Sequence, residues 1–132
     1  MDYKIRLVRY VYYFSLLGLL VIYLFPGSII GCFLYGDCRQ QPDFIPNPLG
    51  TSINHALAFF YLSMLSLMSY VGRASFKQTI TFLITLSLLL ELSHLVIPNR
   101  SFQSLDLFAN FIGTLLAIVI IFSYKKLKNG KI

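Results

Sequence analysis

The residues of this chain that could do chemistry lie in two neighbouring stretches of its C-terminal half. Glu91 and His94 are three positions apart, so they share one face if the segment is helical. Asp106 and Asn110 are four apart and share a face in the same way, with Arg100 between the two stretches. Their carboxylate, imidazole, amide and guanidinium groups can bind an anion, hold a metal ion or transfer a proton.

The segments that carry these residues are typical of membrane helices. The sequence is 57% hydrophobic and 12% charged, with a mean hydropathy of +0.72, and a soluble domain of this size could not bury so much apolar surface. A hydrocarbon core of roughly 30 Å is crossed by about 20 helical residues. Four segments are long enough: 8–25, 53–71, 79–97 and 105–124. We therefore predict an all-α, four-helix transmembrane bundle that forms a single domain over residues 1–132.

The basic residues indicate how this bundle is oriented. If the N-terminus is cytoplasmic, nine of the eleven Lys and Arg residues are cytoplasmic and only Arg39 and Arg100 lie outside. The positive-inside rule then predicts that both termini are cytoplasmic, in a bacterial inner (plasma) membrane. A basic stretch before an apolar run is also typical of a signal peptide, and residues 29–32 resemble a lipoprotein cleavage box. Because the apolar run is long, we expect an uncleaved first helix.

A long external loop is predicted between the first and second helices. Residues 26–52 are rich in Gly and Pro, which excludes a continuous helix. Cys32 and Cys38 both lie in this loop, on the side that is expected to face an oxidising compartment. A disulfide between them is one interpretation, and two unpaired thiols are the other, since a spacing of six residues does not decide the geometry.

The predicted topology places the polar side chains at one depth in the membrane. The third helix runs outward and ends near Pro98, whereas the second and fourth run inward from the same side. A stripe of small residues, Gly113-x-x-x-Ala117, allows close approach of a neighbouring helix below them. The residues that we expect to converge at the outer face are His55, Glu91, His94, Arg100, Asp106 and Asn110.

Three interpretations of this polar cluster remain open. Placing a charged side chain at mid-bilayer costs at least about 2.5 kcal/mol of free energy, so we expect the cluster to have a structural or functional role. It could be an internal clamp of paired charges, or a site where Arg100 receives the anionic group of a lipid or glycan. Metal binding or catalysis is the third interpretation. Glu91-x-x-His94 has the spacing of di-iron bundles, but those need the motif twice, so we predict no metal ion and no cofactor. No nucleophile motif accompanies Glu91 or His94, which argues against an enzyme.

The same residues resemble the signature of the VanZ-like family of small integral membrane proteins. That signature reads Glu-x-x-Gln, a short run, Pro-x-Arg, and then Asp-x-x-x-Asn-x-x-Gly. The matching positions are Glu91, Pro98, Arg100, Asp106, Asn110 and Gly113. His55 and Phe59 fit the family's His-x-x-x-Phe, whereas His94 replaces the usual glutamine, and Thr51 and Ser52 stand where many relatives have Asp-Lys. The resemblance covers roughly residues 51–120.

The resemblance implies a protein of the cell envelope. The family is named for low-level resistance to teicoplanin, a glycopeptide antibiotic that binds cell-wall precursors at the outer membrane face. We therefore predict binding of a lipid-linked saccharide or a lipid headgroup by the outer cluster. Membrane lipids and a lipid-linked cell-wall precursor are the expected partners, and nucleic acid is not, because the basic residues flank apolar segments. One alternative is a structural accessory subunit of a larger membrane complex, and another is an envelope hydrolase or transferase.

Overall fold

The chain folds entirely into helices. A computed structural model describes residues 3–42 and 52–129, and within these ranges it contains five helices and no strand. The helices are α1 (Tyr3–Leu24), α2 (Ile29–Tyr35), α3 (Ser52–Tyr70), α4 (Phe76–Ser93) and α5 (Ser104–Asn129). The prediction of an all-α fold is therefore confirmed.

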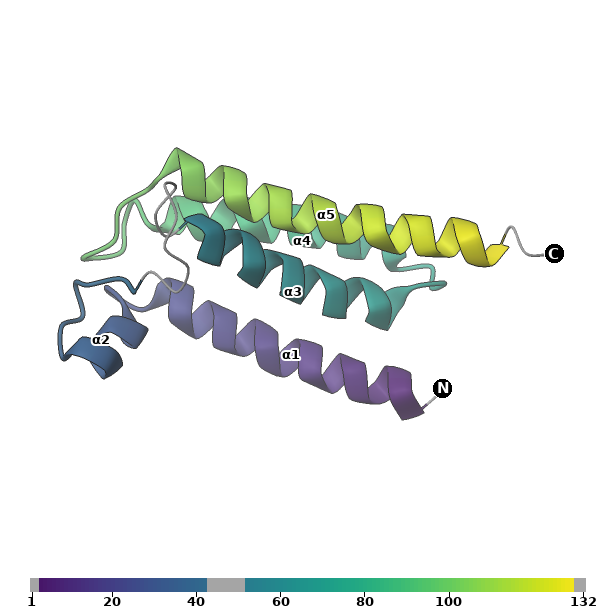
Figure 1. The fold of residues 1–132 in the computed structure, drawn as a ribbon, viewed down its shortest axis with the longest axis horizontal. Helices are drawn as coiled ribbons and strands as arrows, with labels where there is room; N and C mark the ends of the chain where they lie inside the picture. The colour runs from purple at the N-terminus through teal and green to yellow at the C-terminus, as the bar shows by residue number, and fades with distance from the viewer. Residues whose placement is uncertain (1–2, 43–51, 130–132) are drawn as a thin grey trace.

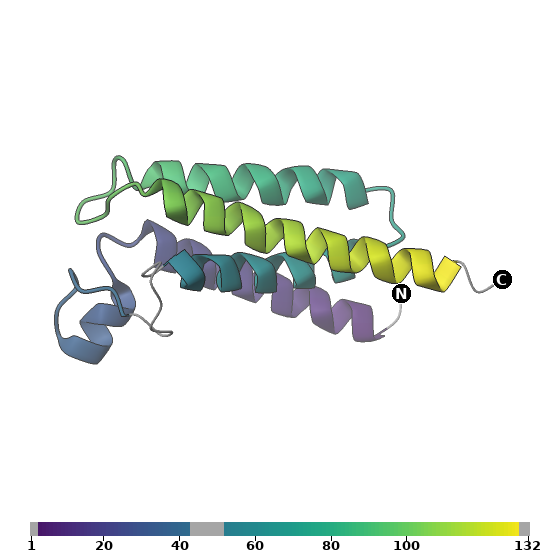
Figure 2. The same cartoon turned by 45° about the horizontal axis from the view of Figure 1, so that its top comes forward.

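Four of these helices lie side by side and alternate in direction. In Figures 1 and 2, α1 and α4 run one way and α3 and α5 the other, so that α1 begins and α5 ends at the same end of the bundle. The short helix α2 lies at the opposite end, and α3 is central because it packs against α1, α4 and α5. This arrangement follows from the short connections between α3, α4 and α5, which favour antiparallel neighbours.

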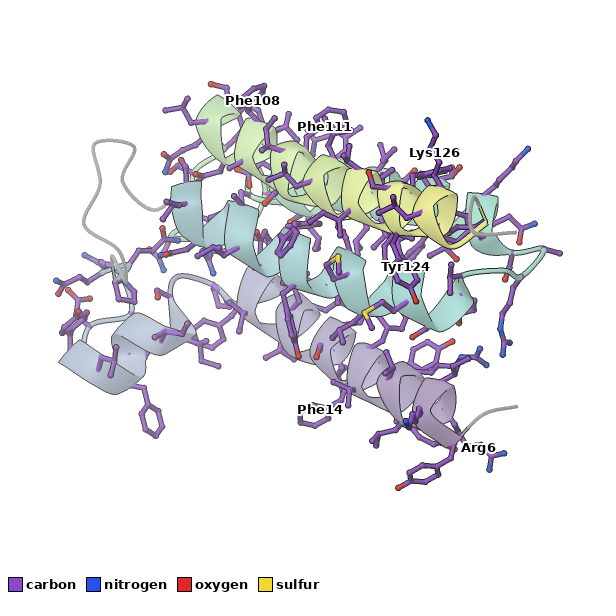
Figure 3. All side chains as sticks on the ribbon, turned by 45° about the vertical axis from the view of Figure 1, so that its right-hand side comes forward. Arg6, Phe14, Phe108, Phe111, Tyr124 and Lys126 are labelled. Atoms are coloured by element: carbon purple, nitrogen blue, oxygen red, sulfur yellow. A yellow bond between two sulfur atoms is a disulfide. The ribbon has the colours of Figure 1, made fainter. Side chains whose placement is uncertain are left out.

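Three of the described helices, α1, α4 and α5, are long and apolar enough to cross a membrane. Their outward side chains fit a lipid environment: Figure 3 shows Phe14, Phe108 and Phe111 directed away from the bundle, and Phe14 is 78% exposed. Helix α3 falls outside this set; it carries Asn54, His55 and several serines but no Asp, Glu, Lys or Arg. The fourth crossing, over residues 53–71, stays a prediction.

The end of α4 and the predicted external loop differ from what was expected, and α1, α4 and α5 extend beyond the predicted segments at the other end of the bundle. Helix α4 ends at Ser93 rather than near 97, because Pro98 disfavours continued helix and Asn99 takes a left-handed backbone with φ of 59°. The predicted external loop contains the short helix α2, which the pattern of Gly and Pro residues in the sequence did not predict. Ser28 caps its start by accepting a hydrogen bond from the Gly31 amide, and Gly36 ends it in the left-handed conformation.

The disulfide interpretation of the external loop holds: Cys32 and Cys38 are bonded to each other. The bond joins α2 to the segment of chain that folds back over it, where the Ser28 amide donates to the Cys38 carbonyl at 2.6 Å. Gly27 has a φ of 93° and approaches this carbonyl so closely that a Cβ atom would overlap it. The described part of the loop is thus a closed structure at one end of the bundle.

The closest helix contact is made by the stripe of small residues on α5. Ala117 is fully buried, and a Cβ atom at Gly113 would overlap the carbonyl oxygen of Ala56 on α3. Only a glycine therefore lets α5 approach the α3 backbone at this level. Because Asn110 and Asp106 lie one and two turns above Gly113, this contact sets their distance from His55 on α3.

We expect Gly113→Ala to destabilise the bundle by about 2 kcal/mol, because the added methyl group must push α5 away from the α3 backbone. Gly18→Ala is the matched control, since nothing lies within 4 Å of a Cβ atom there and a helical alanine is slightly favoured over glycine. Far-UV circular dichroism of the detergent-solubilised protein measures both melting temperatures. A Gly113→Ala variant as stable as the Gly18→Ala variant contradicts the close contact.

Candidate functional site

The residues predicted to converge do so at the end of the bundle that carries α2. His55 comes from the first turn of α3, Glu91 from the last turn of α4, and Asp106 and Asn110 from the first two turns of α5. His94 directly follows α4. All five side chains are buried, and Glu91 and Asn110 are completely so. The structure therefore brings side chains from three helices together at one end of the bundle.

The imidazole of His55 lies between the two carboxylates. Its Nδ1 is 3.8 Å from Glu91 Oε2, and its Nε2 is 3.6 Å from Asp106 Oδ2. The other Glu91 oxygen lies 3.4 Å from His94 Nδ1 and accepts a hydrogen bond from the Gln103 amide at 3.1 Å. The other Asp106 oxygen accepts from the Ser52 hydroxyl at 2.5 Å.

Tyr23 brings α1 into the site, a contribution that was not predicted from the sequence. Its hydroxyl donates to Asn110 Oδ1 at 3.0 Å and lies 2.9 Å from His55 Nδ1. Its ring stacks on His94 with the ring centroids 5.6 Å apart. The sequence offered one indication of this role. Tyr23 lies near the predicted outer end of the first apolar segment, where a tyrosine hydroxyl needs a hydrogen-bond partner.

Arg100 does not pair with the carboxylates as the sequence suggested it could. Its Nη2 donates to the Ile22 carbonyl at 2.6 Å and its Nε to the Phe25 carbonyl at 3.4 Å. These carbonyls end α1 and have no partner within the helix, so the guanidinium caps that helix. Burial lowers the pKa of Arg100 from its usual value, while Tyr23 and the carboxylates act in the opposite direction, and an arginine remains charged under such conditions.

Two cavities meet beside this cluster. One, of about 290 Å³, lies between α1 and α3, and its apolar wall includes Leu19, Ile22, Leu57 and Ala58. The other, of about 230 Å³, is polar and is lined by Arg39, Gln41, His94, Arg100, Gln103 and Asp106, among others. Ser28, Gln41 and Arg100 line both cavities, so the two volumes adjoin. His55 faces the apolar cavity and Asp106 the polar one.

No protein-family model, curated protein or solved structure matches this chain. The site is therefore interpreted from its own chemistry. Its carboxylates and imidazoles can exchange protons or ligate a cation, and its two arginines can bind an anion. An apolar cavity that adjoins a polar one suits a ligand with a hydrocarbon part and a charged part.

We expect Tyr23→Phe to lower the free energy of unfolding by about 1–3 kcal/mol, since it leaves Asn110 Oδ1 and His55 Nδ1 buried without this partner. Tyr13→Phe is the control: it removes an exposed hydrogen bond to Tyr70 and should change stability by less than about 0.5 kcal/mol. Unfolding in a titration with a denaturing detergent, followed by circular dichroism, gives both values. Equal losses would show that Tyr23 does not organise the cluster.

Proposed function

We propose that this chain is a VanZ-like integral membrane protein of the bacterial cell envelope that binds an amphiphile with an anionic headgroup. The ligand class comprises phospholipids and lipid-linked saccharides, which share a hydrocarbon tail and a phosphate. The observation that carries the proposal is the pair of adjoining cavities, one apolar and one polar, with Arg100 in the wall of both.

The apolar cavity fits the tail of such a ligand. It lies between α1 and α3, and two of its lining side chains, Ile22 and Leu57, are also exposed on the outside of the bundle. A cavity wall that reaches the lipid-facing surface gives a hydrocarbon chain a route from the bilayer without passing through water. Transfer of a tail along such a route costs little, because both ends of the route are apolar.

The polar cavity fits the headgroup. Arg39 and Arg100 both line it, and a planar guanidinium binds phosphate through paired hydrogen bonds. Arg100 uses only part of its donor set on the carbonyls of Ile22 and Phe25. Gln41 and Gln103 add amide groups that suit the hydroxyl or acetamido groups of a saccharide.

The VanZ-like assignment rests on the residues of the family signature. Glu91, Asp106 and Asn110 meet in one buried cluster, Arg100 lines the adjoining cavities, and Gly113 sets the approach of α5 to α3. These positions lie on α4, on α5 and in the connection between them, yet all serve one end of the bundle, which supports a shared role. We include a contribution to glycopeptide resistance in this proposal, because the protein would bind a cell-wall precursor at the outer face.

We also propose that α3 crosses the membrane with the other three helices and that the cluster faces the outside. The opposite end of the bundle carries most of the basic residues: Figure 3 shows Arg6 on α1 and Lys126 on α5 at that end. Arg9 lies over the Tyr70 ring and Lys125 over the Phe76 ring, each 4.9 Å from the centroid. This belt of cations favours a cytoplasmic location.

Reporter fusions test the orientation. Green fluorescent protein fused after Ile132 should fluoresce, and alkaline phosphatase at the same position should be inactive, because the positive-inside rule keeps this end in the cytoplasm. Alkaline phosphatase fused after Gln41, following α1 alone, should be active outside. The reverse pattern would place the cluster at the cytoplasmic face and contradict the proposal.

Lipid binding tests the function. For the purified protein in nonionic detergent, we expect preferential binding of short-chain phosphatidylglycerol over phosphatidylcholine with the same chains, measured by native mass spectrometry. Arg39→Gln and Arg100→Gln should each weaken binding about tenfold, the effect of one charged hydrogen bond. Lys77→Gln, at the other end of the bundle, is the control. Arg39 is exposed, so its variant separates binding from folding.

A parallel titration with a short-chain polyprenyl diphosphate saccharide distinguishes the two ligand sources, since the tighter ligand identifies the class. If both arginine variants bind the lipid as tightly as the original protein, Arg39 and Arg100 do not form the anion site. Stoichiometric co-purification with a larger membrane assembly, with no lipid bound, would instead favour the accessory-subunit alternative.

A further inference from the structure

We propose that His55, Glu91 and Asp106 form a binding site for one divalent transition-metal ion of the Zn²⁺ type. This inference does not depend on the lipid ligand and replaces the expectation of no metal. It rests on three separate observations: the position of the ligand atoms, the hydrogen bonding of the imidazole, and an unsatisfied buried carboxylate oxygen.

The three side chains place their ligand atoms around one point. One nitrogen of His55 and one carboxylate oxygen each from Glu91 and Asp106 all lie within 4.8 Å of one another, and all three residues are buried. In a tetrahedral Zn²⁺ site, ligand atoms about 2.1 Å from the ion are about 3.4 Å apart. His55 Nε2 and Asp106 Oδ2 are separated by 3.6 Å, so small side-chain movements complete the geometry.

The hydrogen bonds of His55 present the correct nitrogen. The single hydroxyl proton of Tyr23 is donated to Asn110 Oδ1, so the Tyr23 oxygen accepts from Nδ1–H of His55 at 2.9 Å. In the neutral form the imidazole then carries its lone pair on Nε2, which faces Asp106. Metal-binding histidines characteristically donate their second ring N–H to such an acceptor, which fixes the tautomer and the ring plane.

One oxygen of Glu91 lacks a partner. Oε1 accepts from the Gln103 amide, but Oε2 is buried and has no hydrogen bond among the residues that the structure describes. A buried acceptor with no partner costs about 1–3 kcal/mol, and more when it is charged. Oε2 lies 3.8 Å from His55 Nδ1, so the Glu91 side chain must turn toward Nε2 for this oxygen to reach the proposed ion.

The charge of the cluster also favours a cation. Within the described ranges, neither Glu91 nor Asp106 forms an ion pair with a lysine or arginine, and Arg100 is bonded to backbone carbonyls instead. Two carboxylates are therefore buried in a helix bundle, and the described groups that touch them are imidazoles, the Ser52 hydroxyl and the Gln103 amide. A divalent cation neutralises both, whereas uncompensated buried charges are strongly unfavourable.

The donor set determines the class of metal. One imidazole with two carboxylates suits Zn²⁺ and its neighbours in the first transition row, while Mg²⁺ and Ca²⁺ prefer oxygen ligands alone. Three protein ligands leave one coordination position for an exogenous group. Because Asp106 also lines the polar cavity, that position is accessible to an anionic headgroup.

Metal titration of the full chain tests this proposal. The protein is purified without a polyhistidine tag, stripped with a chelator and titrated with Zn²⁺ in competition with a chromophoric indicator, and the metal content is measured by mass spectrometry. We expect one Zn²⁺ per chain, no competition by Mg²⁺ or Ca²⁺, and visible absorption bands of four- or five-coordinate Co²⁺ on substitution. The cysteines form a disulfide and do not contribute thiolate ligands.

Conservative variants distinguish the ligands from their surroundings. Glu91→Gln, Asp106→Asn and His55→Gln should each weaken Zn²⁺ binding at least about 100-fold, beyond the range of outer-shell effects. His94→Gln, which touches Glu91 without joining the ligand set, should weaken it about tenfold. Asp37→Asn alters an exposed carboxylate and should change nothing.

Circular dichroism of each variant shows whether it is folded, and only folded variants are compared. Zn²⁺ should also raise the melting temperature of the original protein and of Asp37→Asn, but not that of Glu91→Gln, by mass action on the folded state. The proposal is overturned by the absence of stoichiometric Zn²⁺ in the original protein, or by equal affinity in the Glu91→Gln and Asp37→Asn proteins.

Discussion

Two carboxylates buried at one end of an apolar helix bundle impose the main constraint on this structure. Glu91 and Asp106 arrive on different helices, and each must find polar partners where water is excluded. The partners come from three other places in the chain: the imidazole of His55, the hydroxyl of Ser52, and the Gln103 amide. The need to satisfy these two groups therefore fixes how α3, α4 and α5 meet, independently of the apolar contacts lower in the bundle.

The first helix is joined to this arrangement by two residues with different roles. Tyr23 places its hydroxyl between His55 and Asn110, while Arg100 extends from the α4–α5 connection to the last carbonyls of α1. Because the chain continues from α1 into the disulfide-closed loop, these contacts also position Ser28 and Gln41 in the walls of both cavities. The cavities are thus a consequence of how the polar cluster holds the end of α1.

The end of the bundle at which the polar groups meet was predictable from the sequence, but the pairing of individual groups was not. Helix direction follows from charge and segment length, so the convergence of His55, Glu91, Asp106 and Asn110 could be derived from the sequence alone. Arg100 shows why the pairing could not be predicted. The carbonyls at a helix end compete with carboxylates for the guanidinium, and the spacing of residues in the sequence does not show which partner is preferred. Tyr23 was missed for a related reason, since a tyrosine at a membrane boundary is common and its partner is set by tertiary packing alone.

Helix α3 is central in the bundle although several polar side chains lie along it, and this placement links assembly to the site. Helix α3 carries His55 and the fully buried Ser63 and Ser66, and it packs against α1, α4 and α5. In a bilayer, a helix with these groups facing lipid would expose them to hydrocarbon, whereas neighbouring helices shield them and provide partners such as Thr114 for Ser63. Burial of the polar groups of α3 then depends on the other three helices being in place. The same contacts that stabilise α3 also bring His55 to the carboxylates, so the polar cluster forms only when the whole bundle has assembled.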